Sequence, residues 1–247
     1  MPFENGLTYY YFGSRVLRLT SPYTRGTDVK VLQTLLNYLP TSITGPDIMT
    51  DGIYGPKTEA AVRKFQQYFR ISVDGIVGSE TYWTLGQAVG SYTGNTVFGS
   101  RTLRRTSQTA DVSILQNRLN AKAKKYANAV GAPADGIFGP KTESAVKLFQ
   151  QDYGLAIDGV VGPKTFNQLF INTFMGGRTL RRNMSGLDVY ALQNKLITLN
   201  YLPAGAADGK FGPQTEAAVK NFQMAYGLSA DGIVGRLTYY QLGIRGA

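Results

Sequence analysis

Residues 51–86, DGIYGPKTEAAVRKFQQYFRISVDGIVGSETYWTLG, contain the phrase Asp-Gly-x-x-Gly twice. The aspartates of this pair, Asp51 and Asp74, are 23 residues apart in the chain. A second and a third pair with the same spacing begin at Asp135 and at Asp208. Identical internal spacing in three copies indicates a repeated structural unit. The chain is therefore predicted to be an array of three modules, with the length changes confined to the segments between the pairs.

The composition limits both the size and the chemistry of each module. The 247 residues are 43% hydrophobic, which is enough to bury cores, but a repeat of about 75 to 85 residues is near the lower limit for independent folding. The chain contains no cysteine and no histidine. This excludes disulfides, thiolate or imidazole metal sites, and Ser-His-Asp or Cys-His catalysis. Because only carboxylate chemistry would remain, we predict no enzyme, no cofactor and no metal site.

The sequence gives no sign of insertion into a membrane. No apolar run approaches the roughly 20 residues that a transmembrane helix needs. Residues 1–11 also lack the basic start and the apolar stretch of a secretory signal. We therefore expect no membrane insertion, and no signal peptide or export route is visible in this chain.

Each module is predicted to begin with a short extended arm. A run of this length, between a glycine and a Ser, Thr or Asn, favours a strand over a helix. The arms lie at residues 14–19, 100–105 and 177–182 and join the modules. The predicted domains are an N-terminal extended segment at 1–12 and modules at 13–90, 91–171 and 172–247.

Three amphipathic helices are predicted to follow each arm. In the first module, helix one begins near Asp28, whose charge suits the positive end of a helix, and carries Leu32 and Leu36 on one face. Helix two begins at Pro56, because proline at the first helical position loses no hydrogen bond. Helix three carries Leu85, and both later modules repeat these patterns. The predicted fold class is mainly α, with three tandem small three-helix modules joined by short extended or β arms.

The order of these motifs resembles the peptidoglycan-binding domain family. The resemblance rests on Asp-Val-x-x-Leu-Gln-x-x-Leu, then Asp-Gly-x-Phe/Tyr-Gly-x-x-Thr-x-x-Ala-Val-x-x-Phe-Gln, then Asp-Gly-x-Val-Gly-x-x-Thr-x-x-x-Leu. It covers three tandem copies and nearly the whole chain. It implies three-helix bundles that attach to bacterial cell-wall peptidoglycan without catalysis, with avidity from three modules. Family members commonly carry a hydrolase beside the binding module, and modules of about 80 residues leave no room for one here.

Twelve residues of the first turns and second helices form a candidate ligand site, with a carboxylate, an aromatic ring, a hydroxyl and an amide in each module. The same residues also suit a structural role, because Asp-Gly favours turns and a repeated aromatic residue fills a small core. One carboxylate per turn is far short of the roughly six to eight oxygen ligands of calcium. The candidates are Asp51, Tyr54, Thr58, Gln66, Asp135, Phe138, Thr142, Gln150, Asp208, Phe211, Thr215 and Gln223.

A second candidate set lies in the N-terminal segment and the arms, where much of the net charge of +10 is concentrated. These tyrosines and arginines are predicted to contact another subunit or an anionic partner such as a wall polymer. Charge is the only feature that would suit nucleic acid, and no basic reading helix or aromatic sheet accompanies it, so nucleic acid is not a predicted partner. The set comprises Tyr9, Tyr10, Tyr11, Arg15, Arg18, Arg101, Arg104, Arg105, Arg178, Arg181 and Arg182.

Two functions of different classes fit this sequence. The first is a non-catalytic protein that binds peptidoglycan or another cell-wall glycan and acts as a tether, coat or adaptor. The second is an extracellular structural protein that assembles into a filament or surface layer, with residues 1–12 and the basic arms making the contacts between subunits. Both place the chain at the cell envelope, on the extracellular surface or on a spore. Fold by itself does not decide between them.

Overall fold

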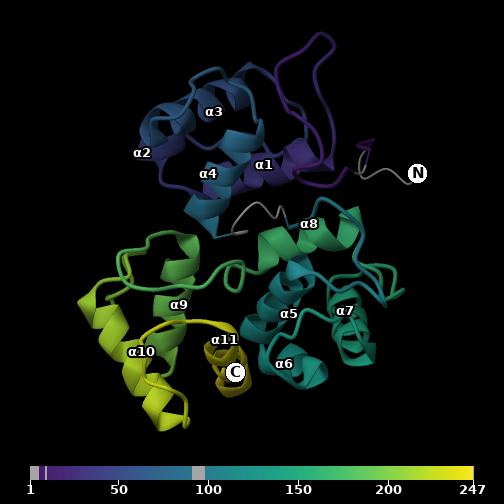
Figure 1. Ribbon diagram of the computed structural model, residues 1–247. Helices are drawn as coiled ribbons and strands as arrows, with labels where there is room; N and C mark the ends of the chain where they lie inside the picture. The colour runs from purple at the N-terminus through teal and green to yellow at the C-terminus, as the bar shows by residue number, and fades with distance from the viewer. Residues whose placement is uncertain (1–5, 9, 91–97, 247) are drawn as a thin grey trace.

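The computed structural model describes residues 6–8, 10–90 and 98–246. Within these ranges the chain is helical and has no sheet, and the predicted mainly α fold with three modules is confirmed (Figure 1). The first module contains α1 (Thr27–Tyr38), α2 (Thr41–Thr44), α3 (Pro56–Phe69) and α4 (Ser79–Val89). The second contains α5 (Ala110–Lys122), α6 (Lys124–Val130), α7 (Pro140–Asp152) and α8 (Pro163–Asn172). The third contains α9 (Leu187–Thr198), α10 (Pro213–Ala225) and α11 (Arg236–Arg245).

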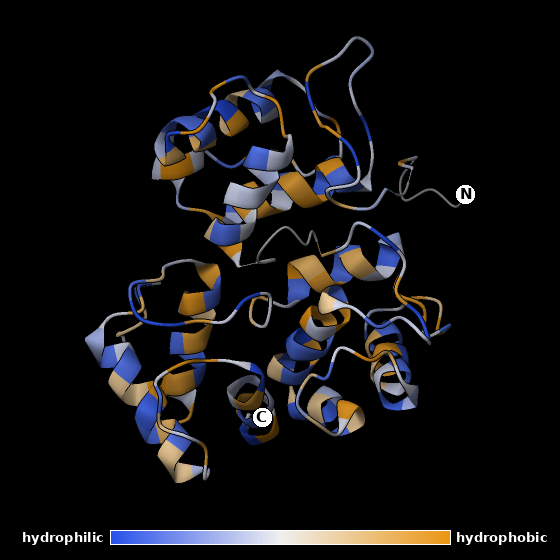
Figure 2. Cartoon of the chain, in the orientation of Figure 1, coloured by the Kyte–Doolittle hydropathy of each residue, from blue (hydrophilic) through white to orange (hydrophobic). Residues whose placement is uncertain are grey.

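The three predicted helices are present in every module. Helix two begins at the expected proline in each copy, at Pro56, Pro140 and Pro213. The apolar stripes face inward, as the hydropathy colouring shows (Figure 2). In the first module Leu32 and Phe65 are fully buried. Because the local sequence patterns and the buried faces agree, the helices of each small core are well specified.

Two modules contain a short additional helix that the sequence patterns did not predict. In the first module α2 follows Pro40, and in the second α6 follows α5 after the single residue Ala123. Helix α6 buries Tyr126 and Val130, which are four residues apart on one face, so a weak helical signal was present. Only the third module is the plain three-helix bundle that was predicted.

The arms belong to the modules that follow them. Leu17 forms an antiparallel bridge with Val77 in the second Asp-Gly turn, and Arg25 forms one with Ile53 in the first turn. The same two bridges occur in the other modules: Leu103 with Val161, Gln108 with Ile137, Leu180 with Val234, and Ser185 with Lys210. Turns expose backbone groups that need hydrogen-bond partners. The arm supplies them to the second turn, and the residues between the arm and helix one supply them to the first turn. This supports the predicted assignment of each arm to its own module, although the residue boundaries stay predictions.

The three modules pack directly against one another (Figure 1). Helix α8 of the second module lies on α1 of the first, α4 of the first contacts α9 of the third, and α11 of the third packs on α5 and α6. Between the first and third modules, Arg178 Nη1 donates to Gln87 Oε1 at 3.0 Å. Each module therefore contacts both others, and the protein is a closed group of three rather than a string of domains.

The N-terminal segment takes part in this packing. Phe12 is buried between Tyr82 of the first module and Phe170 of the second, with ring centroids 5.2 Å away on each side. Tyr11 reaches the second module through its hydroxyl, which hydrogen-bonds Thr102. The described part of the segment is thus anchored on its own chain. Tyr9 lies outside the described residues.

Candidate functional site

Each Asp-Gly turn is held by a glutamine side chain from an earlier helix of the same module. In the second turn of the first module, Gln66 Nε2 donates to Asp74 Oδ1 at 2.8 Å, to the Ile76 carbonyl at 3.0 Å and to Thr81 Oγ1 at 3.1 Å. Gln66 Oε1 accepts a hydrogen bond from the Gly75 N–H at 2.9 Å. One buried amide therefore ties the turn to the helices on both of its sides, and we call this arrangement the glutamine clamp.

The glutamine clamp occurs six times, twice in each module. The glycine after each aspartate has a φ between 69° and 79°, which a residue with a Cβ rarely adopts, so Asp-Gly is required by the turn. The clamping residues are Gln33, Gln66, Gln116, Gln150, Gln193 and Gln223. Sequence reasoning singled out only the three in helix two. The repeated Leu-Gln of helix one was the signal for the other three.

The twelve predicted ligand residues divide into two groups. The three aspartates are exposed, and hydrogen bonds from Gln193 and from the Lys210 N–H lower the pKa of Asp208. The aromatic, hydroxyl and amide side chains are all buried, none more than 3% exposed. Ligand contact by these nine side chains stays a prediction, and it would require the turns to open. They are Tyr54, Thr58, Gln66, Phe138, Thr142, Gln150, Phe211, Thr215 and Gln223.

The three buried aromatic residues, Tyr54, Phe138 and Phe211, help to form the cores of their modules. The Tyr54 hydroxyl donates to the Gly75 carbonyl at 2.8 Å and so links the two turns of its module. Phe138 and Phe211 occupy the same place without a hydroxyl, each 1% exposed. In modules this small, large apolar side chains supply most of the core. Stacking of these rings on a sugar is not possible in the conformation seen here.

Replacing a clamping glutamine by leucine should destabilise its module by about 2–3 kcal/mol, because the buried Gly159 N–H and the Val160 carbonyl lose their partner. We expect this result for Gln150→Leu, measured as a lower urea midpoint by circular dichroism. The matched control is Gln151→Leu, which changes the next, exposed residue of α7. Equal midpoints for the two variants would contradict a structural role for the clamp.

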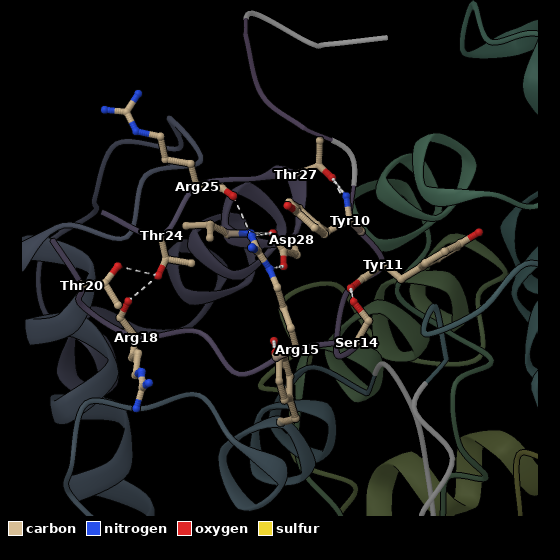
Figure 3. A network of polar contacts seen from close by, with 12 residues as sticks. Tyr10, Tyr11, Ser14, Arg15, Arg18, Thr20, Thr24, Arg25, Thr27 and Asp28 are labelled. Carbon is tan, nitrogen blue, oxygen red and sulfur yellow. Dashed lines mark hydrogen bonds and ion pairs between the residues drawn. The ribbon is translucent and has the colours of Figure 1, made fainter. Parts of the chain in front are cut away.

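The first arginine of each arm forms an ion pair inside its own module. Arg15 Nε lies 2.7 Å from Asp28 Oδ2, its Nη2 donates to the Arg25 carbonyl at 2.6 Å, and its guanidinium lies over the Tyr10 ring (Figure 3). Arg101 pairs with Asp111 and Arg178 with Asp188 in the same way. Four residues that were predicted to contact a partner therefore already make contacts within the chain. They are Arg15, Tyr10, Arg101 and Arg178, and a partner would have to compete with these contacts.

The remaining arm arginines occupy two kinds of position. Arg105 and Arg182 pair with Glu143 and Glu216 of the second helices, at 3.1 Å and 3.4 Å. The arginine that directly follows the bridging leucine of each arm is exposed on the surface, and Figure 3 shows Arg18 pointing away from the network around Arg15. These residues, Arg18, Arg104 and Arg181, are the best placed of the set to meet an anionic partner.

A cavity of about 180 Å³ lies beside the second turn of the third module, between the end of α10 and the start of α11. Its lining combines the carboxylate of Asp231 with the apolar side chains of Leu228, Ile233 and Leu237. Ile233 and Leu237 are exposed. Gln223 lies in the wall, with its amide engaged in the clamp. Of this lining the predicted site included only Gln223, because the groove forms only where two helix ends meet.

The three modules are tandem all-α bundles, and each is built around two clamped Asp-Gly turns. The chain belongs to the family described as “Putative peptidoglycan binding domain”, which matches residues 25–85, 108–169 and 185–242. The family resemblance of the sequence is thereby confirmed for all three modules. These matches support a cell-wall glycan as the partner.

Several curated proteins that resemble parts of this chain are named as enzymes. N-acetylmuramoyl-L-alanine amidase CwlL of Bacillus licheniformis is 30% identical over 199 residues, which cover 70% of this chain and 53% of the relative. The zinc D-Ala-D-Ala carboxypeptidase of Streptomyces albus G is 58% identical over 70 residues, 26% of this chain and 27% of the relative. A spore cortex-lytic enzyme of Bacillus cereus is 40% identical over 65 residues, 26% of this chain and 25% of the relative. This chain therefore spans about half or less of the length of these relatives.

Proposed function

We propose that this chain binds bacterial cell-wall peptidoglycan without catalysis and acts as a tether, coat or adaptor at the cell envelope or on a spore. The observation that carries the proposal is the presence of three complete family modules, each with both of its turns clamped. The amidase, carboxypeptidase and spore cortex-lytic relatives support a wall partner.

The absence of catalysis is part of the proposal and rests on side-chain chemistry. The sequence holds no histidine or cysteine. Among the described residues no group of three or more acidic side chains lies close enough together to hold a metal ion. No helix in the described part of the chain is both long and apolar enough to cross a bilayer. What remains suits recognition, through turns and grooves on a rigid body.

We propose that the three modules bind the wall together as one packed unit, and not as separate domains on flexible linkers. Modules on flexible linkers gain effective concentration that depends on linker length. Here the three modules are fixed relative to one another, so their turns meet the wall with one geometry. The residues that follow the second turn also differ between modules, with Glu80, Lys164 and Leu237 in corresponding positions. The modules are therefore proposed to contribute unequally, with the groove at Leu237 as the leading contact.

The test is co-sedimentation of the full chain with purified peptidoglycan sacculi. We expect the chain to pellet with sacculi and to stay in solution without them. Leu237→Glu should lower the bound fraction severalfold, because it places a charge in the apolar part of the groove. The control is Met224→Glu, which changes an exposed apolar residue of α10 outside the groove. A chain that stays in solution with sacculi would overturn the proposal.

Assembly into a filament or surface layer remains a prediction that the same experiment addresses. Regular fibres in the pellet of the sample without sacculi would favour it. Arg18, Arg104 and Arg181 are exposed arm residues that suit contacts between copies. Deleting residues 1–12 would be a poor test, because it removes Phe12 from the packed boundary between the first two modules. Charge reversal of the three arginines is the sharper test, because all three are exposed and we expect the fold to be kept.

A further inference from the structure

A second cavity, of about 250 Å³, lies between the second and third modules, away from the Asp-Gly turns. It is bounded by the end of α5, by residues 172–175 after α8, and by one face of α9. A single water needs only about 10–15 Å³ of such space, so the cavity can admit part of a larger ligand. No one module contains this site, since its walls meet only when the two modules pack together.

The cavity is lined by cations from both modules. Lys122 of α5 and Lys195 of α9 lie on opposite walls, and Arg118 lies in the same lining. Arg118 is 1% exposed, and its Nη1 donates to the Thr173 carbonyl at 2.5 Å and to Thr173 Oγ1 at 2.9 Å. None of the described residues that line the cavity carries a carboxylate, although Asp188 lies near enough to Arg118 to favour its charged form. Lys122 and Lys195 are therefore the cations best placed to meet an anion in the cavity.

The pKa values of these three cations are lowered, which agrees with an excess of positive charge around the cavity. Desolvation lowers the pKa of Lys122, and the nearby charge of Lys125 lowers it further. Desolvation and the charge of Lys122 lower the pKa of Lys195. Burial lowers the pKa of Arg118 to about 10. Lys122 is exposed and Lys195 is partly buried, so these two cations repel each other across the mouth of the cavity, and an anion bound between them would relieve that repulsion.

The rest of the lining selects among anions. Amide and hydroxyl groups are present at Asn172, Asn194 and Thr198. Phe174 and Met175 add apolar surface on the side of the second module. A phosphate polymer would gain nothing from an apolar wall, whereas a carboxylate that carries a small aliphatic side chain would use both parts of the lining.

We propose that this inter-module cavity binds the terminal carboxylate of a short peptide with small side chains, held between Lys122 and Lys195. The inference deepens the proposed function, since the peptide stems of peptidoglycan would supply such a carboxylate. The lysines would form charge-assisted hydrogen bonds to the carboxylate, and the side chain would lie against Phe174 and Met175. The third module would then add a wall contact that it cannot make alone.

The test is titration of the full chain with N-acetyl-D-Ala-D-Ala by calorimetry, with the carboxamide of the same peptide and inorganic phosphate as separate arms. We expect the free carboxylate to bind at least tenfold more tightly than the carboxamide or phosphate. The double variant Lys122→Gln/Lys195→Gln should bind at least tenfold more weakly. The charge-matched control Lys57→Gln/Lys64→Gln changes two exposed lysines of the first module and should keep the affinity within about twofold.

Each contrary outcome overturns a definite part of the inference. Equal binding of peptide and carboxamide would exclude a carboxylate site. Equal binding of phosphate would show a general anion site, and equal losses in both double variants would show a non-specific effect of net charge. Sacculus binding by the wild type together with no peptide binding would sink this inference and leave the proposed function standing. Loss of sacculus binding in the wild type would instead count against the function itself.

Discussion

Asp188→Ala is expected to destabilise the third module by about 3–5 kcal/mol, because it leaves the Arg178 guanidinium buried without its counter-charge. The two side chains are 5% and 1% exposed, and Arg178 Nε lies 2.7 Å from Asp188 Oδ2. Arg178 also donates to the Ser185 carbonyl at 2.7 Å and to Gln87 of the first module. Burial raises the pKa of Asp188, so the intact pair adds little net stability while the loss of one partner is costly.

The other modules provide two matched controls for this prediction. Asp28→Ala removes the partner of Arg15, whose side chain is 30% exposed, and Asp111→Ala removes the partner of Arg101, which is 51% exposed. Water can solvate a guanidinium left on the surface, so the loss for Asp111→Ala should be about 1 kcal/mol or less. Urea unfolding followed by circular dichroism should rank the losses as Asp188 first, Asp28 second and Asp111 third. Three equal losses would show that burial does not set the cost.

Gly243→Ala is expected to separate the third module from the second. A Cβ at this position would overlap the carbonyl oxygen of Asn120 in α5 and would also lie 3.3 Å from Ala127 Cβ in α6. A backbone carbonyl cannot rotate away as a side chain can, so α11 must move off α5. Overpacking of this kind costs about 1–3 kcal/mol or more. Hydrogen exchange should show faster exchange in α11 and α5, and urea unfolding should split into two transitions.

Gly235→Ala is the matched control for Gly243→Ala. It lies directly before α11, and a Cβ there would meet no atom within 4 Å. Because Gly235 is the N-cap of α11, we expect a loss of about 1 kcal/mol or less and a single unfolding transition. Gly243→Ala should also abolish binding of N-acetyl-D-Ala-D-Ala, since the inter-module cavity depends on the same packing. If both variants kept the wild-type unfolding curve, the contact between α11 and α5 would not be holding the modules together.

The candidate site was only partly visible in the sequence. Asp51, Asp135 and Asp208 could be placed in turns because Asp-Gly has a strong local preference. The clamp of Gln66 on Asp74 joins residues only eight positions apart, yet the motif alone did not show that the amide points inward. Of the groove at Asp231 and Leu237, only Gln223 was among the predicted residues, because the groove is the space left between two helix ends.

By itself, the sequence determined the module count, the helices and the turns. Each depends on interactions within a few residues: proline at the start of α3, apolar residues at helical spacing, and glycine where φ is positive. Residues at the same position of the repeated motif can be exposed in one module and buried in another, and only the tertiary structure decided which is which. Arg101 and Arg178 occupy the same motif position, yet one is exposed and the other is buried against Gln87, 91 residues away in the chain. Such contacts depend on how whole module surfaces fit together, and no local pattern encodes that fit.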